Sequence, residues 1–311
     1  MTVRGPIVAG YNGSEQARDG LALGKRLCSG LDTGAVVLSV LTYAPTETTM
    51  DAYERMLRED EARLGAEARA ALSGIDPIEI VAMPGVSPAH ELHDLAVARG
   101  AAAIVLGSTH RGAIGRVIPG TVADRLLSAA PCPIAVAPRG YADDRRSFDS
   151  IAVAYDGSTE AGVALELAAE LARALGARLD LVVVANPQAA LTAVPTAGAV
   201  PMAGGHAGFV VTEEGTERER GRMQDALDSA LATIPDEVDA TGQVVVDFDP
   251  QSVILTASQS SDLLLIGSRG YGPLGRVLLG GVSSAVLREA SCPVIVTPRS
   301  LVADDAEAVA R

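Results

Sequence analysis

The chain has 311 residues, of which 48% are hydrophobic and 3% aromatic, and it carries a formal net charge of −14 at pH 7. This length is enough for two domains, each able to bury a core of its own. The negative charge argues against partners bound by phosphate neutralisation, and the few aromatic side chains offer little surface for stacking bases. We therefore expect no binding to nucleic acid or to an anionic membrane.

The N-terminal segment MTVRGPIVAG has no long apolar run of the signal-peptide kind. No later stretch is long and apolar enough to cross a bilayer. Cys28, Cys132 and Cys292 are odd in number and widely spaced, which fits reduced thiols better than a disulfide framework. We therefore expect a cytoplasmic protein.

The first half alternates short apolar runs with helical patterns. A strand at Pro6–Gly10 leads into the turn Tyr11-Asn12-Gly13-Ser14 and then into a helix, for which Ser14 is the expected N-cap. Small or apolar residues recur along that helix at the spacing of one face: Ala17, Leu21, Gly24 and Cys28. The elements expected next are strands at Ala35–Leu41, Ile78–Ala82, Ala103–Leu106 and Ile134–Ala137, and helices at Asp51–Leu72 and His90–Arg99.

The second half repeats this series. Its turn is Tyr155-Asp156-Gly157-Ser158, with Ser158 as the expected N-cap of a helix whose apolar face carries Ala161, Leu165, Ala168 and Ala172. The other expected helices are Thr216–Ala232, Ser252–Ser258 and one from near Gly281 to Ala290. The expected strands are Ile151–Ala154, Leu179–Val184, Gln243–Phe248, Leu263–Ile266 and Val294–Val296.

A glycine-rich loop makes the repeat plain. The first copy contains Gly107, Ser108, Gly112, Gly115, Arg116, Val117 and Gly120, and the second contains Gly267, Ser268, Gly272, Gly275, Arg276, Val277 and Gly280. Cys132-Pro133 likewise recurs as Cys292-Pro293. The second copy is longer by about 16 residues, which fit best as a loop. The sequence therefore predicts two tandem domains, 1–146 and 147–311.

The additional residues are expected within the segment 187–215, which is rich in Ala, Gly and Pro and shows little periodicity. Such a segment has little apolar surface with which to offset the entropy lost on ordering. It follows the second strand of its domain, so we expect it to be mobile and to lie over the ligand site. A passive surface loop is the alternative.

Continuous Val, Ile and Leu runs between helices predict an α/β fold with parallel, doubly wound sheets. The last strand of each copy, Ile134–Ala137 or Val294–Val296, would leave an apolar sheet edge. We expect these two strands to pair antiparallel, as an intramolecular pseudo-dimer. Whether two chains then form a homodimer stays open.

The loop of the second copy also predicts a ligand. Glycines allow close backbone approach, and the helix expected from Gly281 would direct free N–H groups and the positive end of its dipole at a phosphate. Turn formation or close packing would explain the same glycines, although their recurrence after an apolar strand in both copies favours a ligand. Parallel sheets of this kind bind ligands beyond the carboxyl ends of their strands.

With these motifs the chain resembles a tandem universal stress protein of the ATP-binding type. That family carries a strand ending in Asp-Gly-Ser and a late G-x2-G-x9-G-[S/T] loop. The resemblance covers nearly all of both halves and implies, in each, a five-stranded parallel sheet of order 3-2-1-4-5. It also implies an adenine-nucleotide-binding protein of the stress response that regulates rather than catalyses, with ATP, with or without Mg²⁺, as its ligand.

Carried over by position, the resemblance assigns Asp156 to the ribose and Val184 to the adenine. The phosphate contacts are assigned to Gly267, Gly270, Gly280, Gly281, Val282 and Ser283. Gly281 stands where the family has Ser or Thr. The first copy keeps Val40, Gly107, Gly120 and Thr121, but Asn12 replaces the Asp and His110 replaces the second loop glycine. The second site is therefore ranked above the first.

Other polar residues carry less information. His90 and His93 lack further convergent ligands and are interpreted as a solvated helix face, since a closed zinc site needs four ligands. Asp156 could also serve only its own Asp-Gly turn. Four arginines flank the loops: Arg111, Arg116, Arg269 and Arg276. Each could bind a phosphate or pair with the excess carboxylates of the chain, and the surface interpretation is slightly favoured.

An enzyme is the alternative of a different class. Neither glycine loop carries the Lys of a Walker-type ATPase. A slow ATPase or a nucleotidyl-transferring enzyme of the same fold stays open, as does a scaffold whose nucleotide sites have decayed. No catalytic residue and no metal ligand is assigned.

Overall fold

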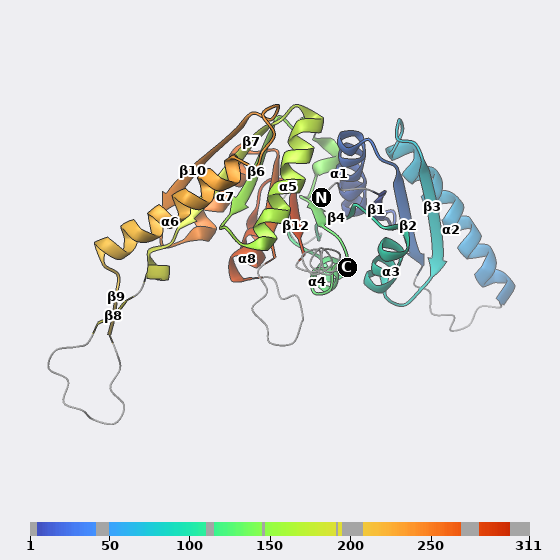
Figure 1. The fold of residues 1–311 in the computed structure, drawn as a ribbon. Helices are drawn as coiled ribbons and strands as arrows, with labels where there is room; N and C mark the ends of the chain where they lie inside the picture. The colour runs from blue at the N-terminus through green and yellow to red at the C-terminus, as the bar shows by residue number, and fades with distance from the viewer. Residues whose placement is uncertain are drawn as a thin grey trace, which may run out of the picture.

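The two halves of the chain fold alike in the computed structural model, which describes residues 5–41, 50–109, 115–144, 147–190, 192–194, 208–268 and 280–298. The first half runs β1 (Ile7–Gly10), α1 (Glu15–Leu31), β2 (Ala35–Leu41), α2 (Met50–Ala71), β3 (Ile78–Pro84), α3 (Pro88–Arg99), β4 (Ala103–Gly107), α4 (Thr121–Leu127) and β5 (Ile134–Ala137). A 3₁₀ turn, η1 (Tyr141–Asp143), lies between the halves (Figure 1).

The second half repeats the order with additions after its second strand. It runs β6 (Ser150–Tyr155), α5 (Thr159–Leu175), β7 (Arg178–Ala185), η2 (Pro187–Ala190), β8 (Thr192–Val194), β9 (Gly208–Val210), α6 (Glu213–Leu231), β10 (Ala240–Val246), α7 (Pro250–Ser260), β11 (Leu263–Gly267), α8 (Gly281–Glu289) and β12 (Val294–Thr297). The first helix of each half is capped as expected, because the Ser14 and Ser158 hydroxyls accept from the N–H groups of Ala17 and Ala161 at 3.1 and 3.2 Å.

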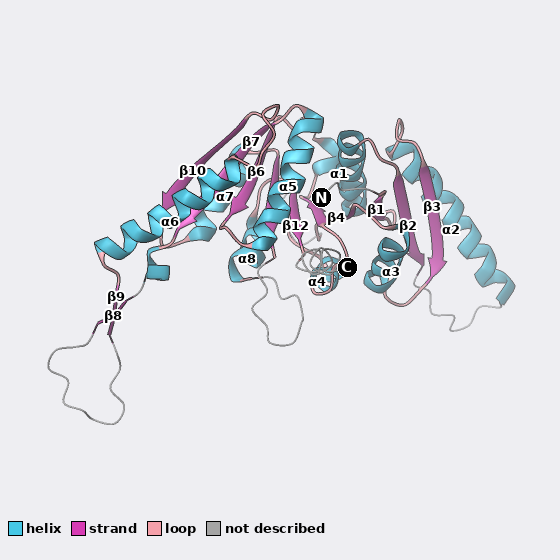
Figure 2. Cartoon of the chain, viewed as in Figure 1, coloured by secondary structure: helices cyan, strands magenta, loops and turns pink. Residues whose placement is uncertain are grey.

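One continuous sheet runs through the molecule, in the order β10-β7-β6-β11-β12-β5-β4-β1-β2-β3. Each half contributes five parallel strands in the order 3-2-1-4-5, which confirms the predicted fold. The halves meet where β12 pairs antiparallel with β5, with Ile295 opposite Ala135. The expected pairing of the last strands is therefore confirmed. Helices cover both faces of the sheet (Figure 2).

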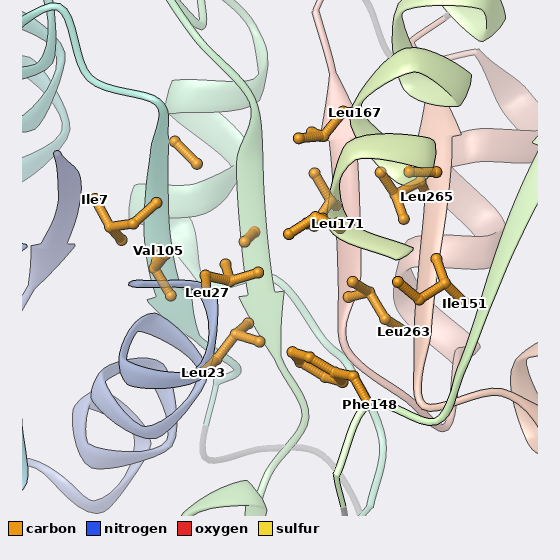
Figure 3. Packing of buried hydrophobic residues seen from close by; sticks show 14 of the residues in the cluster. Ile7, Leu23, Leu27, Val105, Phe148, Ile151, Leu167, Leu171, Leu263 and Leu265 are labelled. Atoms are coloured by element: carbon orange, nitrogen blue, oxygen red, sulfur yellow. The ribbon is translucent and has the colours of Figure 1, made fainter. Parts of the chain in front are cut away.

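The core is shared by the two halves, which departs from the expectation that each domain would bury its own. Both clusters of buried residues contain side chains from either half. One of them brings Leu23 and Leu27 of α1 together with Leu171 of α5 and with Phe148, which precedes β6 (Figure 3). A Cβ on Gly30 of α1 would lie 2.9 Å from the Leu175 side chain of α5, so these two helices pack closely.

The segment 187–215 contains structure that its composition did not predict. β8 and β9 pair antiparallel, and α6 begins at Glu213, where the Thr212 hydroxyl accepts from the Gly215 N–H at 3.1 Å. The hairpin projects beyond the end of α6 and away from the sheet (Figure 1). Residues 191 and 195–207 lie outside the described part of the chain. The third strand of this half runs from Ala240 to Val246 and not from Gln243 to Phe248, because the chain turns before α7, where the Asp247 carboxylate accepts from the Asp249 N–H at 2.8 Å.

Side chains of α1 bind the connection between the halves. The buried Asp19 carboxylate accepts from the N–H groups of Gly140 and Ala142, both at 2.8 Å. Burial raises the Asp19 pKa, and these two hydrogen bonds oppose the rise. The Arg26 guanidinium lies 4.5 Å from the Tyr141 ring centre and donates to the Tyr141 hydroxyl at 2.7 Å. The connection is therefore fixed to the first half by charged hydrogen bonds.

The three cysteines are buried and none forms a disulfide. Burial raises the pKa of Cys28 and of Cys132 to about 12, so both stay protonated thiols at neutral pH. In the part of the chain that the structure describes, no helix combines the length and the apolar character that a membrane span requires.

Replacing Asp19 tests the contribution of this connection. Asp19→Ala removes the acceptor for two backbone N–H groups, so we expect the free energy of unfolding to fall by about 1–3 kcal/mol. Amide hydrogen exchange at Gly140 and Ala142 should become faster. Urea denaturation and exchange measured by mass spectrometry check both effects, with the exposed Ser29→Ala on the same helix as control. Unchanged exchange at these two amides would contradict the assignment.

Candidate functional site

A cavity of about 390 Å³ lies in the second half, at the carboxyl ends of β6, β7 and β11. The first turn of α8 forms one wall, and residues of α6, α7, η2 and the start of α5 also line the cavity. The described residues predicted for this site all line it: Asp156, Val184, Gly267, Gly280, Gly281, Val282 and Ser283. Gly270 lies outside the described residues. Residues separated by more than 100 positions in the sequence thus meet in one cavity.

The first half has a corresponding cavity of about 740 Å³ at the ends of β1, β2 and β4. Its lining includes the described residues predicted for this site: Asn12, Val40, Gly107, Gly120 and Thr121. His110 lies outside the described residues. Asp124 also lines this cavity, one turn into α4, and adds a carboxylate near the expected phosphate position.

The polar residue after the first strand of each half shapes its own turn and also lines the cavity. An Asp156 carboxylate oxygen accepts from the Ser158 N–H at 2.9 Å, and the Asn12 amide oxygen accepts from the Ser14 N–H at 3.1 Å. Gly157 follows with φ +79°, a conformation that suits glycine. The turn role and the cavity role therefore coexist in Asp156.

The glycines at the ends of β4 and β11 have a packing role. A Cβ on Gly107 would lie 1.7 Å from the Gln16 carbonyl oxygen, and one on Gly267 would lie 2.9 Å from the Glu160 carbonyl carbon. The absence of a side chain allows the start of α1 or α5 to pack directly on the strand end. Close packing, the alternative that the sequence left open, is therefore sufficient to explain these two glycines.

The glycines at the starts of α4 and α8 differ, because no described part of the chain fills the space beside Gly120 and Gly281. A Cβ on Gly120 or on Gly281 would meet no heavy atom within 4 Å among the atoms described. Gly280 caps α8 with φ −58° and ψ 155°, which any residue can adopt. The open space at the N-terminus of α8 fits a group that approaches the backbone from outside.

Helix α8 brings backbone donors and one hydroxyl to this wall. The first turn of an α-helix contains N–H groups that have no partner within the helix, and they favour an anion. The Ser283 hydroxyl donates to the Gly267 carbonyl at 2.8 Å and so connects α8 with the end of β11. A ligand phosphate would therefore meet backbone N–H groups on a helix that is anchored to the sheet.

Sequence reasoning missed the contribution of α6 and η2. Glu219, Arg222 and Met223 line the second cavity from α6, and Asn186 and Ala189 line it from the chain after β7. Hydrogen bonding to Glu219 raises the Arg222 pKa, and the Asp156 carboxylate adds to the effect. A Glu and an Arg three apart on a helix resemble an ordinary surface pair, so the sequence alone offered no signal for them.

Arg116, His90 and His93 do not line either cavity in the part of the chain that the structure describes. The Arg116 guanidinium donates to the Glu289 carbonyl across the boundary between the halves. Arg111, Arg269 and Arg276 lie outside the described residues. His90 and His93 each lie against Asp94, and the described residues contain no group of three or more potential metal-binding side chains.

Comparisons with known proteins agree on one family. A model of the universal stress protein family matches residues 4–138 and again residues 147–298. A universal stress protein of Mycobacterium tuberculosis is 32% identical over 208 residues, which cover 63% of this chain and 62% of that protein. The match therefore spans less than two thirds of that relative. Another from the same organism is 26% identical over 306 residues, covering 94% of this chain and 99% of the relative.

Solved structures show the same fold. The crystal structure of a universal stress protein from Archaeoglobus fulgidus matches with a TM-score of 0.67 at 20% sequence identity. The match covers 94% of this chain and 98% of that protein. At this identity the likeness concerns the fold alone.

Alanine substitutions can separate the two kinds of glycine. Gly267→Ala should lower the free energy of unfolding by about 1–3 kcal/mol, because its Cβ would collide with the backbone of α5. Gly281→Ala should leave stability unchanged or raise it by up to about 1 kcal/mol, since the residue lies in a helix and its Cβ would meet no described atom within 4 Å. Urea denaturation of both variants checks the contrast. Equal destabilisation by the two changes would show that the protein itself requires both glycines.

Proposed function

The chain belongs to the universal stress protein family, and from this premise we propose that its second half binds an adenine nucleotide, ATP, in the cavity between β6, β7 and α8. One observation carries the proposal: Asp156, the apolar Val184 and the open N-terminus of α8 line the same cavity. A carboxylate suits ribose hydroxyls, an aliphatic strand surface suits a base, and backbone N–H groups suit phosphates.

The geometry of the cavity fits such a ligand. Its volume of about 390 Å³ lies in the range of ordinary small-molecule sites. Gly281 leaves open space beside the first N–H groups of α8, which the phosphates would occupy. Bound Mg²⁺, if it accompanies ATP, would be held mainly by phosphate oxygens and water.

The second site is proposed to be the stronger of the two. Asp156 provides a charged acceptor where the first half has the neutral Asn12. Asp124 lines the first cavity and would repel phosphates there, whereas Ser284 holds the matching place in α8. In addition, the helix that would bind the phosphates is longer in the second half, because α8 has nine residues and α4 has seven, so more peptide dipoles are aligned toward the ligand.

Binding with a regulatory outcome in the stress response, rather than turnover, is the activity we propose. The described lining of the second cavity contains no lysine that could stabilise a transferring phosphate. Its one glutamate, Glu219, forms a bidentate pair with Arg222. The strands that could join two chains already pair within one chain, so the proposal requires no second chain.

Bulk at the start of α8 tests the site. Gly280→Val should weaken ATP binding to the second half by tenfold or more, about 1.4 kcal/mol or greater, because a branched side chain would block approach to the N–H groups. Calorimetric titration with ATP measures affinity and stoichiometry. Gly120→Val in the first half is the matched control, since Gly120 also has a backbone conformation open to any residue.

The controls also separate the alternatives. Retained stoichiometry and affinity in Gly280→Val would refute the proposed site. Steady release of ADP from wild-type protein would favour a slow ATPase. A wild-type chain that binds no nucleotide but retains a protein partner would favour a scaffold.

A further inference from the structure

Helix α6 places an ion pair in the wall of the second cavity. Arg222 donates from Nε and Nη2 to the two carboxylate oxygens of Glu219, at 2.9 and 2.7 Å. The Glu219 side chain is only 10% exposed, whereas that of Arg222 is 61% exposed. Both line the cavity together with Asp156 and Val184. A planar guanidinium, fixed along one edge, is thus available at the mouth of the cavity.

The first half contains the matching arginine. Buried Leu64 and Ala68 of α2 correspond in spacing to buried Met223 and Leu227 of α6, so Arg63 corresponds to Arg222. In both halves the turn after the first strand packs on this stretch of the helix, at Leu64 and Arg63 in the first half and, one helical turn further along, at Ala226 in the second. A Cβ on Gly13 would lie 3.4 Å from Arg63 Nη1, and one on Gly157 would lie 3.6 Å from Ala226 Cβ.

In the first half this arginine is held by two carboxylates. Arg63 donates to Asp60 at 2.7 Å and to Glu67 at 3.2 Å. Glu67 also accepts from the Tyr11 hydroxyl at 2.6 Å and forms an ion pair with Arg18 at 3.5 Å. Arg63 does not line the first cavity. The carboxylate of Glu67 therefore gathers these side chains into a cluster beside the turn.

The second half lacks the centre of that cluster. Ala226 stands in place of Glu67, and Gly162 stands in place of Arg18. With Ala226 in place of a second carboxylate, Arg222 forms its ion pair with Glu219 and lines the cavity. The differences at Glu67/Ala226 and Arg18/Gly162 thus distinguish Arg63, which belongs to a surface cluster, from Arg222, which lines the candidate site.

We propose that the Glu219–Arg222 pair is a specificity element of the second site that contacts the base and ribose of the bound nucleotide. The inference rests on the function proposed above. Helix α6 packs on β7, β10 and η2, so the pair belongs to the part of the cavity that contains Val184 and Asn186. With one edge bound to Glu219, the guanidinium presents its flat face, which stacks on aromatic rings such as a purine.

Matched variants test this role with ATP and adenosine as probes. Arg222→Met should weaken binding of both ligands by about 5- to 30-fold, because a contact with base and ribose does not depend on phosphates. Arg63→Met, the same change at the equivalent place, should alter neither affinity by more than about twofold. Arg222→Lys should not restore binding, since an ammonium cannot stack as a plane.

A change that leaves Arg222 in place provides a second test. Ala226→Glu restores the carboxylate of the first half and should draw the guanidinium out of the cavity. Ala226→Glu should weaken the binding of ATP and of adenosine to an extent similar to that of Arg222→Met. In a chain that already carries Arg222→Met, it should weaken binding little further. Thermal unfolding of each variant verifies that the fold is kept.

The outcomes are distinct. Unchanged adenosine affinity in Arg222→Met would overturn the proposal, and so would a loss limited to ATP, which would indicate a phosphate contact. Wild-type affinity for ATP and adenosine in Arg222→Lys would refute a contact that depends on the planar guanidinium. If the wild-type chain binds neither ATP nor adenosine, the proposed function fails and this inference fails with it. Wild-type binding without an Arg222 effect would refute this inference alone.

Discussion

The antiparallel pairing of β5 with β12 is the interaction on which the rest of the structure depends. A parallel sheet ends in strands whose backbone groups need partners, and these two apolar strands supply them to each other. All their residues are buried, in Ile134–Ala137 and in Val294–Thr297 alike. Because the strands join, α1 packs beside α5 and the two cores become continuous. The connection bound by Asp19 and Arg26 lies alongside this junction.

Duplication has placed two similar cavities at one continuous sheet, and small differences have made them unlike. The loop and strand residues correspond almost one to one, yet the surrounding helices contribute different charges. Asp124 adds a negative group to the first cavity, whereas α6 adds the Glu219–Arg222 ion pair to the second. A single carboxylate, Glu67, decides whether the arginine of the second helix belongs to a surface cluster. Local ion pairing thus determines which of the two cavities is lined by an arginine.

Most of the fold was predictable because it depends on short-range patterns. Apolar runs located the strands to within a few residues, and Ser14 and Ser158 marked the helix starts. The hairpin β8–β9 and the early start of α6 were not predicted, since each depends on contacts that composition does not encode. The roles of Gly107 and Gly267 also required coordinates, because glycine suits close packing and ligand approach equally well.

The sequence by itself determined the duplication, the α/β class, the pairing of the last strands and those described loop residues that line the two cavities. These follow from local periodicity and from matching positions along the chain. Only the tertiary structure decided that the halves share a core, that Asp19 binds the connection, and that Glu219 and Arg222 belong to the second cavity. The physical reason is that such features depend on which faces meet in space. A Glu–Arg pair at helical spacing has the same sequence pattern whether its helix faces solvent or a ligand site.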